Sequence, residues 1–283
     1  MEVILDYLGL VSITTLKQLF LLLGPSLILG LLMHYVSSLV ENGLLNLVGL
    51  NVYMYGLKII GTPVHELGHV IFSLIFGHRI TEVQLFKPDP YSGLLGYVNR
   101  TYDPDSMYQR IGNFFIGIGP IILGSLFIYL SAWGLMGTEI FGPLNGLQMN
   151  SQAFGSAQSF GAMLNHITTI ALEIFSQLFR FENFKTWQFW VFLYILISVG
   201  TSIRLSPVDI RNAASGFFTL VGLAFAFNLL TVWIGTFAIQ VIESLSQNFS
   251  FFYGLLLFTL FLNFALGLLF LLLGAILNRK RKF

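Results

Sequence analysis

Two histidines and a glutamate lie within five residues of an otherwise apolar segment. Residues 61–79 read GTPVHELGHVIFSLIFGHR, and the three polar side chains are His65, Glu66 and His69. On a helix, positions i and i+4 share one face, so both imidazoles can bind the same Zn²⁺ ion. The glutamate can then act as general base on the water that zinc activates. The pattern H-E-x-x-H therefore indicates zinc-dependent hydrolysis.

The alternative is a pair of buried histidines that make hydrogen bonds and hold no metal. Ionisable groups are costly in hydrocarbon, so three of them clustered in one apolar segment favour a functional site. Lys58, seven residues before His65, is expected to extend its ammonium to the outer membrane interface or to pair with a carboxylate such as Glu41. Asn228 and Asn263 are expected to form hydrogen bonds between helices.

The composition is that of a membrane protein. Of 283 residues, 55% are hydrophobic and 10% are charged, whereas soluble proteins have about a quarter charged. Six apolar segments are long enough to cross a bilayer: 12–38, 52–77, 111–136, 186–204, 213–241 and 251–278. The absence of cysteine excludes disulfides and thiolate zinc sites. We expect an all-α polytopic membrane protein, one integral-membrane domain over residues 1–283, with a metalloprotease-like core at 52–241.

The basic residues predict how these segments are oriented. Ten of them fall between the second and third segments, between the fourth and fifth, or after the sixth: Arg79, Lys87, Arg100, Arg110, Arg204, Arg211, Arg279, Lys280, Arg281 and Lys282. Only Arg180 and Lys185 fall in a loop on the other side. The positive-inside rule then predicts a multi-pass protein of a bacterial cell membrane with both termini in the cytoplasm. The basic tail follows a membrane segment, which argues against a nucleic-acid partner.

Two connecting segments have a recognisable character. Residues 78–110 contain alternating polar and apolar positions and then a glycine-flanked apolar run, so a small β segment is expected at the cytoplasmic interface. Residues 138–185 are expected to form an external loop containing an amphipathic helix, which lies on the outer interface or packs against the membrane segments. The apolar stripe of that helix is Phe160, Leu164, Ile167, Ala171, Ile174 and Leu178.

A catalytic zinc ion needs a third protein ligand. Several candidates are on the wrong side or point elsewhere: His34, His78, Glu139, His166, Glu173 and Glu182. Asp103 and Asp105 are on the cytoplasmic side but lie in the turn-like segment YDPD. Asp209 remains, in RLSPVDIRNAASG at the cytoplasmic junction of the fourth and fifth segments. Pro207 breaks a helix there and allows the carboxylate to approach the metal. The alternative role of Asp209 is to stabilise the first turn of the following helix.

These motifs resemble the site-2 protease family of intramembrane zinc metalloproteases, peptidase family M50. His65, Glu66 and His69 match its H-E-x-x-H motif, and residues 207–209 are similar to its Pro-x-Asp-Gly motif. Residues 77–98 are similar to its β segment, and Gly119 with Pro120 matches a Gly-Pro of the intervening span. The resemblance covers about residues 55–230. It departs at Ile210, where the family has glycine, and no asparagine follows Pro120 within a few residues.

The resemblance implies a zinc-dependent intramembrane endopeptidase that cleaves transmembrane or membrane-associated proteins. It implies that His65, His69 and Asp209 hold Zn²⁺ and that Glu66 is the general base. The two departures favour a second interpretation, a non-proteolytic scaffold, immunity or transport component that retains a zinc-site-like motif. A third, an integral-membrane peptidase of the CAAX or heat-shock type with a glutamate ligand, needs a downstream cytoplasmic glutamate. Glu82 is the only one, and it is too near, in a predicted strand.

Overall fold

The computed structural model describes residues 2–141, 165, 169, 172–234 and 250–280. The long helices are α1 (Glu2–Val52), α2 (Lys58–Ile75), α3 (Met107–Met136), α5 (Trp187–Gly200), α6 (Pro207–Thr231) and α8 (Ser250–Lys280). Short helical turns are η1 (Tyr53–Leu57), η4 (Asn183–Lys185) and η5 (Val232–Ile234), and the strands are β1 (Arg79–Gln84) and β2 (Tyr97–Thr101). The fold is thus mostly helical with one small sheet, as the sequence predicts.

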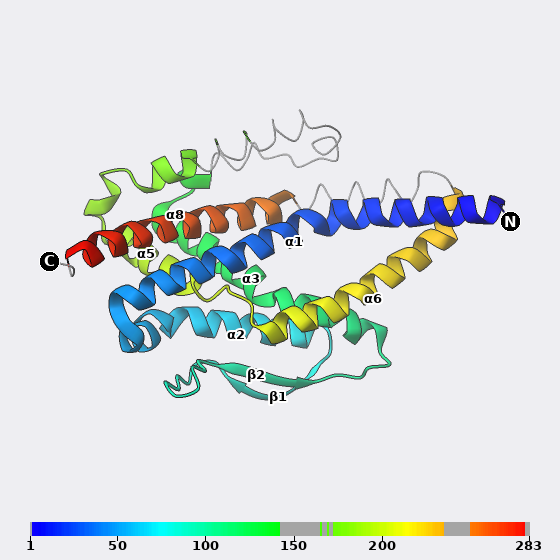
Figure 1. Cartoon of the computed structure of the whole chain (residues 1–283), viewed down its shortest axis with the longest axis horizontal. Helices are drawn as coiled ribbons and strands as arrows, with labels where there is room; N and C mark the ends of the chain where they lie inside the picture. The colour runs from blue at the N-terminus through cyan, green and yellow to red at the C-terminus, as the bar shows by residue number, and fades with distance from the viewer. Residues whose placement is uncertain (1, 142–164, 166–168, 170–171, 235–249, 281–283) are drawn as a thin grey trace.

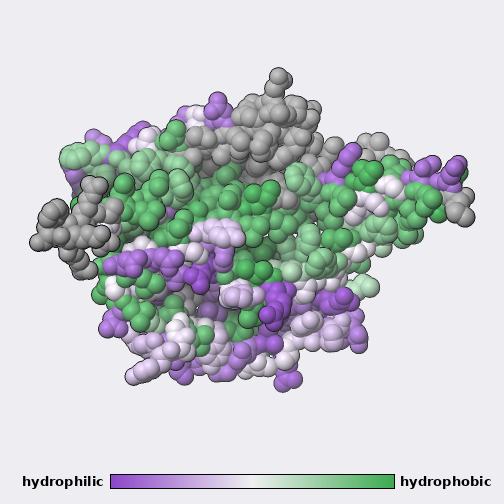
Figure 2. Space-filling model, in the orientation of Figure 1, coloured by the Kyte–Doolittle hydropathy of each residue, from purple (hydrophilic) through white to green (hydrophobic). Residues whose placement is uncertain are grey.

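Five helical stretches of the described residues are long and apolar enough to cross a membrane. They are Glu2–Phe20, Leu27–Ile75, Met107–Met136, Pro207–Thr231 and Gly254–Gly274. Figure 2 shows hydrophobic residues covering the face that α1 and α8 form, while hydrophilic residues gather over the two strands. A surface of this kind fits an integral membrane protein.

Of the six expected membrane segments, the first corresponds to a much longer helix, and the fourth corresponds to a helix too short to be among these five stretches. Helix α1 has 51 residues, about 76 Å, before the chain reverses near Gly49 and η1 and returns as α2 (Figure 1). Gly49 has φ +78°, a conformation that favours glycine. Helix α5, expected over 186–204, has only 14 residues, about 21 Å. It ends at Gly200, so residues 201–206 run as non-helical chain beside α2 and lead into Pro207.

Helices α2, α3 and α6 approach closely because glycines lie where they cross. A Cβ at Gly68 of α2 would stand 2.7 Å from the carbonyl carbon of Gly119 in α3. A Cβ at Gly117 of α3 would stand 2.6 Å from the carbonyl oxygen of Asp209 in α6. Small residues at such contacts are typical of membrane helix pairs. Gly119, singled out by the resemblance, therefore has a packing role between α2 and α3.

The expected β segment is an antiparallel hairpin. Ile80 pairs with Arg100 and Glu82 with Asn99, with a bulge between Ile80 and Glu82. Beyond the strands, Lys87 donates a backbone hydrogen bond of 2.7 Å to the Leu95 carbonyl. Figure 1 shows the hairpin lying alongside α2. Its tip therefore reaches back toward the middle of α2 and does not extend away from the helices.

Asn228 forms the hydrogen bonds between helices that were expected of it, whereas Asn263 makes none in the part of the chain that the structure describes. The Asn228 amide donates to Thr15 Oγ1 at 3.0 Å and to Gln18 Oε1 at 2.6 Å, so it joins α6 to α1 as predicted. Asn263 is buried against Gly200 but forms no hydrogen bond with the described residues, so that prediction is wrong. It fills the space above a glycine of α5.

The expected amphipathic helix in residues 138–185 lies largely outside the described residues. Positions 160, 164, 167 and 171 of its apolar stripe belong to that part. Residues 172–178 are helical, and the last two members of the stripe, Ile174 and Leu178, are each 1% exposed. The apolar face is therefore packed into the protein at this end of the stripe.

Candidate metal centre

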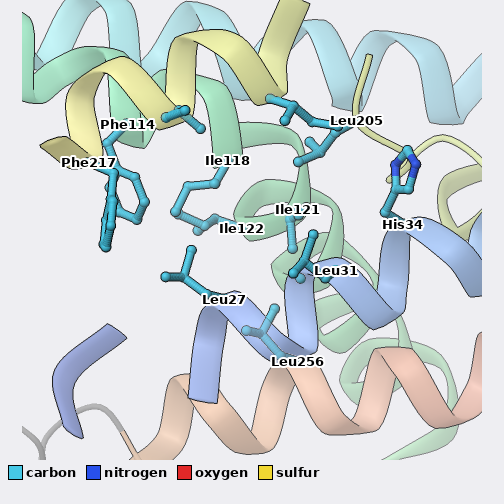
Figure 3. A pocket seen from close by; sticks show the side chains of 14 residues that line it. Leu27, Leu31, His34, Phe114, Ile118, Ile121, Ile122, Leu205, Phe217 and Leu256 are labelled. Atoms are coloured by element: carbon cyan, nitrogen blue, oxygen red, sulfur yellow. The ribbon is translucent and has the colours of Figure 1, made fainter. Parts of the chain in front are cut away.

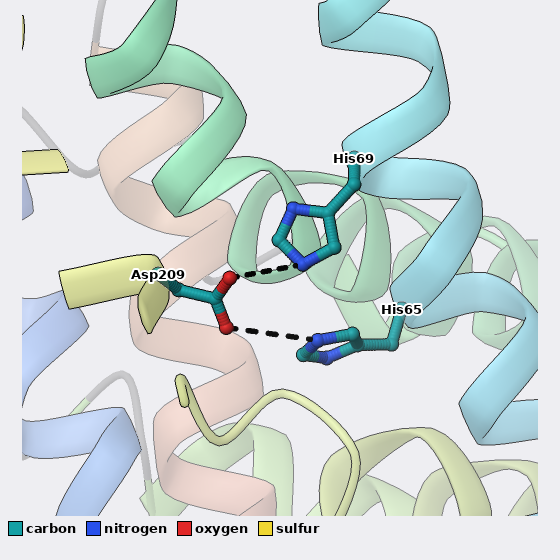
Figure 4. Close-up of side chains that lie close together, drawn as sticks. All are labelled: His65, His69 and Asp209. Atoms are coloured by element: carbon teal, nitrogen blue, oxygen red, sulfur yellow. Dashed lines mark ion pairs between the residues drawn. The ribbon is translucent and has the colours of Figure 1, made fainter. Parts of the chain in front are cut away.

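His65 and His69 lie one turn apart on α2, and both imidazoles point at the carboxylate of Asp209 on α6 (Figure 4). His69 Nε2 is 3.2 Å from Asp209 Oδ1, and His65 Nε2 is 4.0 Å from Oδ2. The ligand atoms of the three residues all lie within 4.8 Å of one another. Bonds of about 2.0–2.1 Å place tetrahedral zinc ligands about 3.3 Å apart. The three side chains can therefore hold one metal ion with little movement.

Hydrogen bonds to backbone carbonyls fix the tautomer of both imidazoles. His65 Nδ1 lies 2.6 Å from the Ser202 carbonyl oxygen, and His69 Nδ1 lies 2.8 Å from that of Ile116. A carbonyl oxygen only accepts, so each Nδ1 carries the proton. Each Nε2 then keeps its lone pair and directs it toward the centre. This is the arrangement in which histidine binds metals.

Asp209 is fixed by the way in which α6 begins. Ser206 and Asp209 form a capping box, in which the Ser206 N–H donates to Asp209 Oδ2 at 2.8 Å and the Asp209 N–H donates to Ser206 Oγ at 3.2 Å. Pro207 occupies the first turn, where its missing N–H costs nothing. Because Oδ1 remains turned to His69, the two roles considered for Asp209 are compatible. The helix cap aims the carboxylate.

Glu66 is buried at 7% exposure and faces the hairpin. Together with His65 it lines a pocket of about 240 Å³. The other walls come from the end of α1, the start of α2, residues 201–207 and the hairpin tip, and they include Glu41, Lys58, Thr62, Arg204 and Gly96. A Cβ at Gly96 would stand 3.0 Å from Glu66 Cγ, so the hairpin backbone passes directly over the carboxylate-bearing side chain.

Lys58 adopts neither of its expected arrangements. Its side chain is buried at 3% exposure, and its ammonium donates to the Thr201 carbonyl at 2.9 Å and to Ser202 Oγ at 3.1 Å. Glu41 pairs instead with Arg204, at 3.0 Å. The physical reason is the early end of α5: the last carbonyls of a helix lack partners and attract a cation. Lys58 therefore holds the segment whose Ser202 carbonyl orients His65.

The other ligand candidates among the described residues lie apart from this centre, and His166 lies outside the described residues. His78 contacts the Gln109 carbonyl at 2.8 Å, and Asp103 accepts the Asp105 backbone N–H at 2.9 Å. His34 lines an apolar pocket of about 260 Å³ between α1, α3 and α6 (Figure 3). Among the described residues, only His65, His69 and Asp209 form a group that could hold a metal ion.

The donor set fits zinc. Two imidazole nitrogens and one carboxylate oxygen, with room for water and substrate, are the ligands of several catalytic zinc sites. No protein-family model, curated protein or solved structure matches this chain.

Proposed function

We propose that the protein is a zinc-dependent intramembrane endopeptidase, as the resemblance to the site-2 protease family suggests. The observation that carries this proposal is the convergence of His65, His69 and Asp209 with both Nδ1 atoms bonded to carbonyls. His65, His69 and Asp209 are the residues that would hold Zn²⁺. The helices that carry them are long and apolar enough to cross a membrane.

Glu66 is the proposed general base. Zinc, when bound, would polarise the scissile carbonyl and lower the pKa of its water to about 7. Glu66 takes one proton from this water as the oxygen attacks the carbonyl carbon, and then gives a proton to the departing amide nitrogen. The C–N bond breaks, and the products are one carboxylate and one amine. Burial of Glu66 beside His65 in the same pocket supports this role.

The hairpin is the proposed holder of the substrate backbone. A peptide bond in a membrane helix is already hydrogen-bonded and dry, so the helix must unwind locally before it can be cleaved. An unwound segment can pair with the edge of a sheet. The hairpin lies alongside α2 and reaches Glu66 through Gly96 (Figure 1). The polar pocket beside Glu66 would supply water.

The proposed membrane arrangement follows the distribution of basic residues. Helix α2 runs from outside to inside, and the metal centre lies nearer the cytosol. The start of α1 and the end of α8 lie at opposite ends of the molecule (Figure 1), so we do not propose that both termini are cytoplasmic. In this arrangement the start of the hairpin is at the cytoplasmic interface, and its tip reaches into the membrane beside Glu66.

A non-proteolytic role is the second candidate function. Two departures from the family's motifs, at Ile210 and after Pro120, support it. Ile210, which stands in place of glycine, lines the apolar pocket of Figure 3. No asparagine closely follows Pro120, and the buried Asn113 on the same helix accepts a hydrogen bond from Arg100 at 3.0 Å. A scaffold, immunity or transport component could keep the zinc ligands without cleaving a substrate.

One pair of measurements separates the two candidates. The full-length protein is reconstituted in bilayers, its zinc content is measured, and its cleavage of a panel of transmembrane peptides is followed by mass spectrometry. The endopeptidase proposal predicts stoichiometric zinc and cleavage by the wild type, with cleavage abolished in His65→Ala. Stoichiometric zinc without cleavage of any peptide supports the non-proteolytic candidate.

A further inference from the structure

Arg100, on β2, is a positively charged side chain beside the metal centre that has no acidic partner among the described residues. Its Nη1 donates to two neutral acceptors, His78 Nδ1 at 2.8 Å and Asn113 Oδ1 at 3.0 Å. Both acceptor residues are buried, at 4% and 2% exposure. Among the described residues the ion pairs are His65–Asp209, His69–Asp209 and Arg204–Glu41, and none includes Arg100.

His78 and Asn113 form a preorganised binding position for the guanidinium, called the seat below. His78 Nε2 lies 2.8 Å from the Gln109 carbonyl oxygen and therefore donates its proton there, which leaves Nδ1 as an acceptor. The His78 ring stacks on Tyr102, with 5.1 Å between ring centres. Burial lowers the pKa of His78, which keeps the ring neutral and able to accept. Arg100 is thus held in one orientation by groups that do not neutralise its charge.

Only part of the guanidinium is used by this seat. Both of its hydrogen bonds to described residues come from Nη1, so Nη2 and Nε make no hydrogen bond in that part of the chain. Arginine presents its donors as a planar fork that matches the two oxygens of a carboxylate. A partly buried cation that is held only by neutral groups is costly unless an anion approaches it.

The seat is next to the metal centre. Asn113 precedes Ile116 by one turn of α3, and the Ile116 carbonyl is the partner of His69. On the hairpin, Gly96 covers Glu66 and Arg100 follows four residues later, about 13 Å along an extended chain. Burial lowers the pKa of Arg100 and the negative charge of Asp209 opposes this shift, so the guanidinium is within electrostatic reach of the ligand carboxylate.

We propose that Arg100 binds a carboxylate of the peptide that occupies the metal centre. This inference rests on the proposed function and adds a specificity to it: an acidic group within about two residues of the scissile bond, a reach of about 7 Å. The carboxylate is either an Asp or Glu side chain or the free C-terminus of the peptide. Arg100 supplies the fork from Nη2 and Nε while His78 and Asn113 hold Nη1.

Two matched pairs of dipeptide hydroxamates test the proposal, because the hydroxamate anchors each probe on the metal. One pair differs only in a C-terminal carboxylate or amide. The other has an amidated C-terminus and differs only in a Glu or Gln side chain. Binding to the zinc-loaded full-length protein is measured by calorimetry in detergent micelles. One acidic probe should bind about 10–100-fold more tightly than its neutral partner, which is the usual effect of charged hydrogen bonds. The pair of probes that shows this difference identifies the source of the carboxylate.

The variants separate carboxylate binding from a structural role of Arg100. The preference is the ratio of the affinity for the acidic probe to the affinity for its neutral partner. In Arg100→Gln this ratio should fall to about 1, while the neutral probe and zinc stay bound as in the wild type. Arg100→Lys, which keeps the charge and loses the fork, should show a reduced preference and serves if Arg100→Gln does not fold. Lys87→Gln removes an exposed cation from the same hairpin and should leave the preference intact.

The possible failures are distinguishable. If the neutral hydroxamates do not bind the zinc-loaded wild type, the metal-centre proposal itself is wrong. If they bind as tightly as their acidic partners, or if the preference survives unchanged in both Arg100 variants, only the assignment of Arg100 is overturned.

Discussion

His69 Nε2 lies 3.2 Å from Asp209 Oδ1, although the two residues belong to different helices. The contact depends on two local features of the backbone. The Ile116 carbonyl holds the other nitrogen of His69, and the capping box with Ser206 holds the other oxygen of Asp209. The metal ligands are therefore oriented by the surrounding protein before any ion binds.

Asp209 should show separable effects on zinc binding and on stability. Asp209→Asn keeps an oxygen for the Ser206 N–H but loses the charge, so we expect a fall in zinc affinity of at least about 10–100-fold with little loss of stability. Asp209→Ala should lose zinc affinity and also about 1 kcal/mol of stability, the usual contribution of a helix cap. Zinc titration against a chelator and denaturant unfolding measure the two effects. Ser206→Ala is the control, because it should weaken the cap and largely preserve zinc binding.

Lys58 should influence zinc binding without touching the metal. Lys58→Met removes the donors to Thr201 and Ser202, which releases the segment that orients His65. We expect zinc affinity to fall by about 10–100-fold, as for other residues that orient metal ligands. Tyr194→Phe removes a different contact of α5, the 2.6 Å hydrogen bond to the Gly56 carbonyl of η1. Equal losses of zinc affinity in the two variants would assign Lys58 to helix packing alone.

Gly117 should be intolerant of a methyl group. Its Cβ would stand 2.6 Å from the Asp209 carbonyl oxygen, so Gly117→Ala must push the start of α6 away from α3. We expect a loss of about 1–3 kcal/mol of stability together with weaker zinc binding. Gly134→Ala on the same helix is the control, because no atom lies within 4 Å of its added Cβ. Denaturant unfolding of both variants gives the comparison, and similar stabilities would contradict the close packing of α3 and α6.

The hairpin should loosen in acid because of His78. Burial lowers the pKa of His78 in the folded protein, so folding favours the neutral ring. Its contribution to stability is complete above the ordinary value of about 6.5 and is lost as the pH falls from there through the lowered pKa. Protonation also removes the acceptor for Arg100. The protection factors of the amides in residues 79–101, which correct for the slower intrinsic exchange in acid, should therefore fall below about pH 6.5, and His78→Gln should weaken this fall. Protection factors that do not change with pH would contradict the proposed neutral state of His78.

The helical, membrane-type fold and the hairpin were predictable from sequence because hydropathy and strand alternation are local signals. His65 and His69 were also predictable, since i and i+4 always share a helix face. Asp209 was reached by eliminating other candidate ligands and by the family resemblance, and its position beside His69 depends on glycine contacts between α3 and α6. Those contacts join distant parts of the chain, so no local pattern reports them.

Lys58 and Arg100 show what sequence reasoning missed. Lys58 was expected to extend to the outer interface or to pair with a carboxylate such as Glu41. The helix over 186–204 was expected to continue to residue 204, so no free carbonyls were expected near Lys58. The early end of α5 exposes carbonyls that bind the ammonium, and the available signal was the Gly200 to Pro207 segment with its serines and threonine. Arg100 was counted only as a cytoplasmic charge. Its place beside Asn113 depends on the register of β1 with β2, which sequence does not specify here.

Glu66→Gln tests the central claim most directly. The substitution removes the proton acceptor and keeps the size of the side chain, so zinc content should stay at the wild-type level. Cleavage of a transmembrane peptide that the wild type cuts should fall by at least about 100-fold, the lower end of general acid–base contributions. Glu82→Gln, an exposed carboxylate of the hairpin, is the matched control and should cleave normally. Wild-type cleavage by a zinc-loaded Glu66→Gln protein would contradict the proposed mechanism.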